Sequence, residues 1–289
     1  MFALDLRGLG AGELIKCAVK EFNADEMPTY AAALAFQALF SLFPFLLFLM
    51  ALISFFDLQP FFDWLRDQAA LLLPAQAMEQ VDKVIVQFQT QKAGLFSFSI
   101  LVALWTASAG VRSMMVAMNR AYDVPEGRPL WKLYPLSTLY TLGIAAMLLS
   151  ASALMVVGPS LMGRLAGLIG FEAYLVVLWT WLRWPVAILL LVVAVAVIYY
   201  VTPDVQQEFR FITPGSLLAV LVWIAASLGF GVYVQNFADY NATYGSVGAI
   251  IVMLLYFYLS AAVLLFGAEL NAIIEHHDPT GKDPGEKTA

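Results

Sequence analysis

The chain has 289 residues, of which 62% are hydrophobic and only 12% are charged. A soluble domain carries roughly 25% charged residues, so this chain has too little charge to cover its own surface in water. Its formal net charge of -6 argues against a nucleic-acid-binding protein, which presents a basic face to phosphates. Cys17 is the single cysteine, which excludes an intrachain disulfide and makes a cysteine metal site a poor expectation.

Six apolar stretches are long enough to cross a membrane, because about 20 helical residues span the ~30 Å of hydrocarbon. Pro185 suits the first turn of the fourth stretch. The shorter apolar stretch 173–181 leads into that span or lies at the interface, and a seventh crossing is the less favoured reading. We therefore expect an all-α, polytopic transmembrane helical bundle over residues 31–268. Its spans are expected at residues 31–56, 94–119, 133–158, 184–201, 214–234 and 246–268.

The N-terminal segment, residues 1–30, contains the pattern of a short amphipathic helix from Glu13 to Glu26. Such a helix can rest at the membrane interface. Its apolar stripe is expected to comprise Leu14, Cys17, Ala18 and Phe22, with Lys16, Lys20 and Asp25 off the stripe.

Two further segments lie outside the predicted spans. Residues 57–93 form the longest connection, and their periodicity on each side of Pro74 predicts two amphipathic helices in the first outer-face loop. Residues 269–289 form the C-terminal tail, which we expect to be cytoplasmic and largely disordered, because Pro, Gly and charged residues crowd its last part.

Lys and Arg are distributed unequally between the two sides of the predicted bundle. Ten lie on the side that holds both termini, and five lie on the other. Because cytoplasmic loops carry the excess of positive charge, this distribution places the N- and C-termini in the cytoplasm.

Several local strings resemble those of a known family. They are ALAF at 33–36, SLFP at 41–44, LWTAS at 104–108, MNRAYD at 118–123, TPGS at 213–216, YVQNFADYNATYGSVG at 233–248 and GAELN at 267–271. Together they resemble the YihY/virulence factor BrkB family of bacterial inner-membrane proteins, from about Glu21 to His276. The resemblance implies a multi-pass protein of the inner (plasma) membrane with six helices and both termini cytoplasmic. Family members were formerly labelled ribonuclease BN, and the usual suggestion for them is transport or export of an unsettled substrate.

Two charged residues lie near the predicted cytoplasmic ends of spans. Arg112 lies toward the cytoplasmic end of the second span and Glu269 lies at the cytoplasmic end of the sixth, so both are expected near the same membrane face. A charge left alone against lipid is costly. The two side chains are therefore interpreted either as a charge pair or coupling-ion site inside the bundle, or as an interfacial anchor and a structural hydrogen bond.

The segment between the fifth and sixth spans is rich in polar side chains and has no basic residue. One interpretation is a polar mouth that binds substrate or cation. The other is a tight helical hairpin whose Asn and Asp side chains cap helix ends and whose Gly245 supplies a turn. The candidate residues are Asn236, Asp239, Tyr240, Asn241 and Tyr244.

Pro44 removes a backbone hydrogen bond in the first span and is expected to kink it. Gln37 and Ser41 lie nearby on the same helix. One interpretation is that the freed carbonyl groups face a cavity, and the other is that Pro44 produces only a structural kink.

These features favour a transporter, exporter or flippase-like protein that is not driven by its own ATP hydrolysis, with membrane lipids around it and an amphipathic or lipid-related substrate. No ATP-binding or hydrolase motif is present. The alternative is a non-transporting scaffold for envelope assembly or integrity, and association with a second copy of the chain is open. No enzyme activity, cofactor, metal or nucleic-acid partner is expected. A ribonuclease is disfavoured, because the only two histidines, His276 and His277, are adjacent and no His, Asp and Glu cluster supports metal-dependent hydrolysis.

Overall fold

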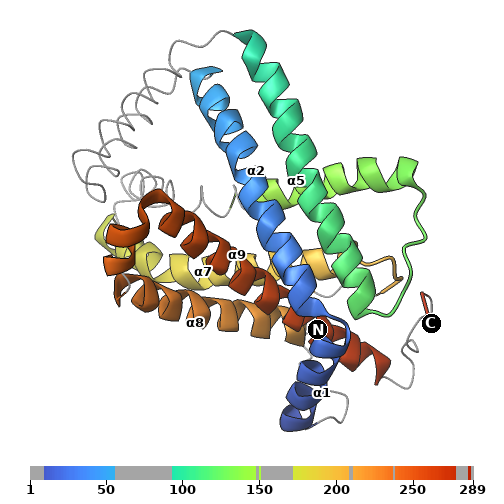
Figure 1. Cartoon of the computed structure of the whole chain (residues 1–289). Helices are drawn as coiled ribbons and strands as arrows, with labels where there is room; N and C mark the ends of the chain where they lie inside the picture. The colour runs from blue at the N-terminus through green and yellow to red at the C-terminus, as the bar shows by residue number, and fades with distance from the viewer. Residues whose placement is uncertain are drawn as a thin grey trace. The chain divides into compact units, whose positions relative to one another are not determined.

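A computed structural model describes residues 10–55, 93–147, 150, 172–207, 211–236, 238–277 and 286–287. In this part of the chain the backbone forms helices and short connections, and no strand. The helices are α1 (Ala11–Ala24), α2 (Met27–Phe55), α5 (Ala93–Ala121), α7 (Glu172–Val201), α8 (Pro214–Asn236) and α9 (Ala238–His276), and residues 130–147 are also helical (Figure 1). The predicted all-α fold is confirmed.

The chain divides into two compact units. The first comprises residues 1–36 and 111–289, and the second comprises residues 37–110. Both α2 and α5 contribute residues to each unit. The helices α1, α7, α8 and α9 belong wholly to the first unit, which holds the candidate site described below.

Long apolar helices dominate the described residues. Four stretches are long and apolar enough to cross a membrane, and a shorter apolar stretch occupies Met27–Leu42. The predicted transmembrane helical bundle is therefore confirmed. Of the third predicted span, residues 133–147 and 150 are described and helical, and the rest lies outside the described residues. Residues 57–92 of the outer-face loop and part of the C-terminal tail also lie outside them. The four long stretches are Leu101–Ala121, Leu178–Val201, Pro214–Val234 and Gly248–His276.

The fourth predicted span belongs to a longer helix. Residues 173–181 and 184–201 are continuous in α7, which begins at Glu172. Pro185 therefore lies inside the helix, and its placement in a first turn was wrong. Proline removes a backbone donor and crowds the preceding turn, but membrane helices tolerate this change because neighbouring groups satisfy the freed carbonyl.

Five helix ends in the first unit lie at one end of it, which we call the loop end. It comprises the start of α2, the ends of α5, α7 and α9, and the start of α8, together with the connections 122–129 and 202–213. Hydrogen bonds link these segments: the Asn119 side chain accepts from the Asp204 backbone, and the Asn271 side chain accepts from the Gly215 backbone. Such a convergence is expected when successive spans alternate in direction.

At the loop end, α1 packs against α9. Leu14 and Ala18, both on the predicted apolar stripe, are buried with Leu270, Ile273 and Ile274 of α9. The apolar face of this short helix is therefore covered by protein. The exposed Lys16 and Lys20 lie off this face, as an amphipathic helix requires.

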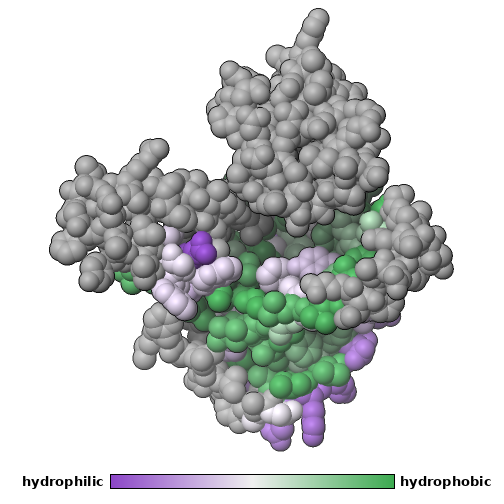
Figure 2. All heavy atoms as spheres, turned by 90° about the vertical axis from the view of Figure 1, so that its left-hand side faces the viewer, coloured by the Kyte–Doolittle hydropathy of each residue, from purple (hydrophilic) through white to green (hydrophobic). Residues whose placement is uncertain are grey.

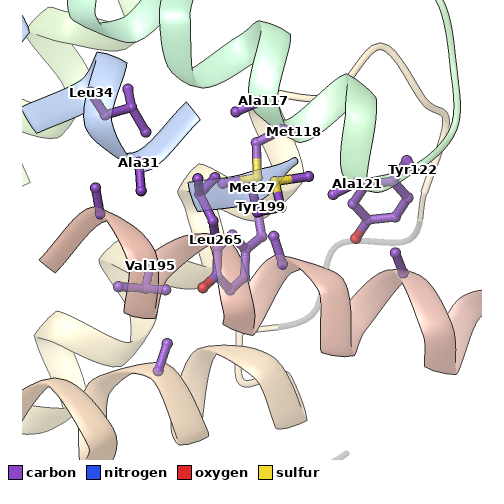
Figure 3. Packing of buried hydrophobic residues seen from close by; sticks show 14 of the residues in the cluster. Met27, Ala31, Leu34, Ala117, Met118, Ala121, Tyr122, Val195, Tyr199 and Leu265 are labelled. Atoms are coloured by element: carbon purple, nitrogen blue, oxygen red, sulfur yellow. The ribbon is translucent and has the colours of Figure 1, made fainter. Parts of the chain in front are cut away.

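The main core of the first unit lies next to the loop end and joins four spans. Met27 from α2, Met118 from α5, Tyr199 from α7 and Leu265 from α9 converge there, each at most 2% exposed (Figure 3). Flexible methionine side chains suit such an irregular junction, because they fill gaps between helices that cross at different angles.

Large apolar side chains also remain exposed along the outer faces of the spans. Hydrophobic residues form a band on the coloured surface in Figure 2, and hydrophilic residues gather at its lower edge. This distribution suits helices surrounded by lipid. Examples are Leu178 and Trp181 on α7, Leu228 on α8, and Ile251 and Leu255 on α9.

Candidate functional site

The described residues include a carboxylate that is buried inside the bundle. Glu269 lies one helical turn after Leu265 on α9, and both residues are almost completely buried. The Oε1 atom of Glu269 has no hydrogen-bond partner in the described part of the chain. A buried polar atom without a partner is costly, and ionisable groups within membrane spans often mark ion or substrate pathways. Glu269 is therefore the centre of the candidate site.

Acidic side chains from other elements surround Glu269. Asp25 follows α1, and Asp123 follows α5, and both lie within electrostatic range of Glu269, as does Glu21. Among the described residues, Arg120 is the basic side chain in range, and its Nη2 lies 3.0 Å from Oδ1 of Asp25. The surroundings of Glu269 thus contain more negative than positive charge.

Asp25 is itself buried, although it was expected to lie off the apolar stripe of α1. Its burial, followed by the nearby Asp123 carboxylate, raises the pKa of Asp25, while Arg120 acts in the opposite direction. The expected position of Asp25 away from the buried face was therefore wrong. Asp25 follows Ala18 by seven residues and Leu14 by eleven, so the helical period itself places it on the buried side of α1, where it meets Arg120.

The backbone turns sharply at two places in this acidic group, next to Asp25 and at Asp123. Glu26 (φ 56°) and Asp123 (φ 54°) adopt left-handed conformations, which are uncommon for residues other than glycine. The turn at Glu26 joins α1 to α2 next to Asp25. The turn at Asp123 ends the helical hydrogen bonding of α5, and the Val124 backbone then donates to the Asn119 carbonyl at 2.9 Å.

A second polar group, which we call the ion cluster, lies at the loop end and comprises Asn119, Glu126, Arg128, Asp204 and Lys287. Arg128 Nε donates to Glu126 Oε1 at 2.7 Å, and Lys287 Nζ donates to Asp204 Oδ2 at 2.5 Å. Asn119 donates to Glu126 at 2.9 Å and accepts from the Asp204 backbone at 2.6 Å. The cluster thus ties the connection after α5 to the connection after α7.

The electrostatics of the ion cluster differ from those around Glu269. Partial burial alone would raise the pKa of Glu126, but hydrogen bonds from Arg128 and Asn119 outweigh burial and hold that pKa below its ordinary value. The pKa of Asp204 is likewise lowered, because hydrogen bonds from Lys287 and the Gly127 backbone outweigh its partial burial. These carboxylates are stabilised as anions, which is typical of a structural cluster.

The start of α8 is held by a side chain from α9. Asn271 Oδ1 accepts from the Gly215 backbone at 2.9 Å, and Asn271 Nδ2 donates to Thr213 Oγ1 at 3.0 Å. Thr213 Oγ1 also accepts from the Ser216 backbone at 3.1 Å, which caps the helix. Two strings that carried the family resemblance, at 213–216 and 267–271, therefore meet at one point.

Polar side chains continue between α8 and α9 away from the loop end. Trp223 Nε1 donates to Ser260 Oγ at 3.0 Å, and the hydroxyls of Ser227 and Tyr256 lie 3.1 Å apart. We call these four residues the polar row. They are partly buried on otherwise apolar helices, where polar contacts join neighbouring spans.

Arg112 and Glu269, predicted as alternatives to be a charge pair, form no ion pair in the described structure. Arg112 donates to Ser137 Oγ at 3.2 Å and lies 4.5 Å from the centre of the Tyr134 ring. Glu269 is instead in electrostatic range of Arg120, two turns further along α5. Both Arg112 and Arg120 lie in the last part of α5, and sequence alone could not tell which one approaches α9.

The remaining predicted positions lie elsewhere. In the second unit, Gln37 Nε2 donates to the Thr106 carbonyl at 3.1 Å and so joins α2 to α5, and Pro44 lies inside α2. Asn236 ends α8, and Asp239, Tyr240, Asn241 and Tyr244 belong to the start of α9, with their side chains outside the described part. Gly245 is within α9, so its predicted role as a turn residue was wrong.

Several residues of the site were not singled out from the sequence. Asn119 and Asp123 belong to the string MNRAYD, and Asn271 belongs to GAELN. The signal was the position of these polar residues at the ends of apolar spans. Their roles depend on contacts with residues more than 50 positions away, which no local pattern specifies.

Comparison with known proteins agrees with the strings noted in the sequence. A family model described as virulence factor BrkB matches residues 18–289. The ribonuclease-like protein YfkH of Bacillus subtilis (strain 168) is 35% identical over 255 residues, which cover 88% of this chain and 92% of that protein. No solved structure matches the chain.

More distant relatives carry the name UPF0761 membrane protein. One from Alteromonas mediterranea is 27% identical, with 87% of this chain and 84% of that protein covered. One from Ralstonia nicotianae is 28% identical, with 90% of this chain but only 58% of that longer protein covered. With nearly its whole length matched and its long apolar helices in place, the chain belongs to the virulence factor BrkB family of membrane proteins.

Proposed function

We propose that this protein is a transporter or flippase-like protein that moves an amphipathic, lipid-related substrate and does not hydrolyse ATP itself. The observation that carries the proposal is Glu269, a carboxylate buried within an apolar helix with one oxygen atom lacking a partner. Such a group is expensive to retain in a membrane protein, and it suits a position where an ion or substrate is bound.

The polar row supports the lipid-related substrate. Trp223, Ser227, Tyr256 and Ser260 place hydrogen-bonding groups along two helices whose outer surfaces are apolar. An amphipathic molecule needs both kinds of surface, because its headgroup requires polar partners while its chains stay in lipid. The row extends away from the loop end, where Glu269 lies.

We further propose that the loop end faces the cytoplasm and that the protein resides in the bacterial inner membrane. Support comes from basic residues that lie at this end on separate segments: Lys16 and Lys20 on α1, Arg120 and Arg128 around the end of α5, and Lys287. The excess of Lys and Arg on cytoplasmic segments makes this orientation the expected one.

A direct test is lipid movement in vesicles that contain the purified full-length chain. Fluorescent phospholipids are placed in both leaflets, and an impermeant reductant is added outside. We expect the wild-type chain to let the reductant quench inner-leaflet lipids, and Glu269→Gln to reduce that rate at least tenfold. Glu13→Gln, which changes an exposed glutamate of α1, is the matched control and should behave as wild type.

The alternative is a non-transporting scaffold for envelope assembly. The close packing of α8 and α9 through Gly215 and Gly267 favours it, because a rigid helix pair suits a structural role. Wild-type vesicles that keep their inner-leaflet fluorescence, as protein-free vesicles do, would refute lipid movement and favour the scaffold.

The name of the Bacillus subtilis relative raises a ribonuclease as a further function to test. Among the described residues, no group of three or more His, Cys, Asp or Glu side chains could hold a metal ion. We propose that the chain is not an enzyme. RNA cleavage that stays with the protein through repeated purification, and is lost in a point variant, would contradict this.

A further inference from the structure

The groups that face Glu269 come from several elements. Asp25 and Glu21 approach from α1 and its following turn, and Asp123 and Arg120 approach from the end of α5. The phenol of Tyr122, buried in the core next to α9, also interacts electrostatically with Glu269. On the side of α7, the Tyr199 hydroxyl is occupied as a donor to the Leu264 carbonyl at 2.6 Å.

These groups leave the charge of Glu269 poorly compensated. Arg120 lies against Asp25 at 3.0 Å, so the one described basic side chain in range already has a carboxylate partner. The Asp25 carboxylate is buried at the same time, and burial together with Asp123 raises its pKa. A further positive charge is therefore needed wherever Glu269 is ionised, because an unpaired buried anion is strongly unfavourable.

The choice of cation follows from the number of oxygen ligands. A bound metal cation needs several oxygen atoms at short, similar distances, and the described His, Cys, Asp and Glu side chains form no group of three that could hold one, so backbone or hydroxyl oxygens would have to supply the rest. A proton needs only one carboxylate oxygen. The Oε1 atom of Glu269, buried and without a partner, offers such an oxygen.

From this geometry we propose that Glu269 is a proton-binding site at the loop end, with Asp25, Asp123 and Arg120 as the surrounding charges that set its occupancy. A proton from water forms an O–H bond with a Glu269 carboxylate oxygen, and the same bond breaks when the proton returns to water. The role of proton binding rests on the transport function proposed above, because the proton would be the coupling ion of that transport.

Carbodiimide labelling tests proton binding on the intact chain. Dicyclohexylcarbodiimide adds to a protonated carboxyl group in apolar surroundings and leaves a stable adduct that peptide mass spectrometry locates. We expect an adduct at Glu269 whose yield falls at least tenfold as the pH is raised from mildly acidic to alkaline. The exposed Glu13 should give no comparable adduct.

Three outcomes are decisive. If sodium ions protect Glu269 from carbodiimide labelling at constant pH, the bound cation is a metal ion and not a proton, and the assignment is overturned. A yield that does not change with pH would also overturn it. If no adduct forms, infrared spectroscopy provides the second measurement: loss of the protonated-carboxyl band in Glu269→Gln supports proton binding, and an unchanged band refutes it.

Because labelling does not require transport, its result separates from that of the lipid assay. Labelled Glu269 with no lipid movement would refute the transport function and leave proton binding in place. Lipid movement together with a Glu269 carboxyl group that binds no proton would refute proton binding and leave the transport function in place.

Discussion

Gly215 of α8 and Gly267 of α9 lie in direct backbone contact where the two helices cross. A Cβ atom added at Gly267 would lie 2.8 Å from the Gly215 carbonyl oxygen and 2.8 Å from the Ala219 Cβ, and it would also clash with the Tyr199 hydroxyl. Real Cβ atoms do not approach other atoms so closely. The crossing therefore requires glycine on α9, and it fixes the distance between the two helices beside the Glu269 site.

Gly267→Ala should destabilise the protein by about 1–3 kcal/mol, because an added methyl group forces closely packed helices apart. Thermal unfolding in detergent measures the effect as a lowered Tm. Gly229→Ala is the matched control: it lies on α8, and a Cβ there would meet no atom within 4 Å. It should be neutral or slightly stabilising, since alanine favours a helix more than glycine does. Equal Tm values for the two variants would contradict the close contact.

Asn271 and Thr213 should behave as a coupled pair at the start of α8. Asn271→Ala removes the acceptor of the Gly215 backbone N–H and the amide donor to Thr213 Oγ1, at a cost of about 1–3 kcal/mol in the free energy of unfolding. Thr213→Ala removes the cap of the same helix. The double variant should be less damaging than the two single effects added together, because both residues share one hydrogen-bond network. Additive losses in thermal unfolding would show that the two residues act separately.

The sequence predicted the helical membrane fold well, because long apolar runs such as 214–234 have few alternatives. It also indicated Glu269, since a carboxylate at the end of an apolar span is conspicuous. It did not predict which arginine comes within electrostatic range of Glu269, because Arg112 and Arg120 lie two turns apart on α5 and either could have approached α9.

The Gly215–Gly267 crossing was equally hidden from the sequence. The helices α8 and α9 are apolar on nearly every face, so hydrophobic periodicity does not indicate which faces meet. Asp25 is a different case, because its spacing of seven residues from Ala18 and eleven from Leu14 already indicated the buried face. Its ion pair with Arg120, which is 95 positions away in the sequence, was not indicated.

Asp25→Asn should change how stability depends on pH. Because folding raises the pKa of Asp25 above its ordinary value of 3.8, the folded chain binds this proton more tightly than the unfolded chain. The contribution of Asp25 to the free energy of unfolding of the wild-type chain is therefore present at low pH and is lost as pH rises through the raised pKa. Asparagine cannot lose a proton, so the Tm of the variant relative to wild type should increase between acidic and neutral pH.

Asp204→Asn is the control for Asp25→Asn, with the opposite sign. The pKa of Asp204 is lowered on folding, so its contribution is present above the ordinary value of 3.8 and is lost as pH falls through the folded pKa. Its Tm relative to wild type should therefore decrease from acidic to neutral pH. Parallel curves for the two variants would refute the assigned directions.

Arg128→Gln should weaken the ion cluster at the loop end. The guanidinium group donates to Glu126 at 2.7 Å and to the Thr202 carbonyl at 3.0 Å, and its side chain is only 12% exposed. Loss of these charged hydrogen bonds should cost about 1–3 kcal/mol at neutral pH. The loss should shrink below pH 4.5, the ordinary pKa of Glu126, as that carboxylate becomes protonated in both proteins.

Lys20→Gln is the matched control for Arg128→Gln. Lys20 is a cation at the same end of the molecule, but its side chain is 81% exposed and lies 3.8 Å from its acidic neighbour Glu21. An ion pair this exposed contributes little to stability. A Tm decrease as large as that of Arg128→Gln would mean that net charge, rather than the hydrogen bonds of Arg128, sets the stability.

Cysteine labelling should place α1 and the connection after α5 on the same side of the membrane. With Cys17 replaced by serine, the chain has no cysteine, and single cysteines can replace the exposed Lys16 and Lys132. Lys16 lies on α1, which packs against α9 at the loop end, and Lys132 lies three residues after the connection 122–129. An impermeant thiol reagent should therefore label both in inside-out vesicles and neither in intact spheroplasts. Labelling of one position from each side would contradict the shared loop end. Labelling of both positions in spheroplasts would agree with a shared loop end but would reverse the proposed orientation, against the excess of positive charge on that side.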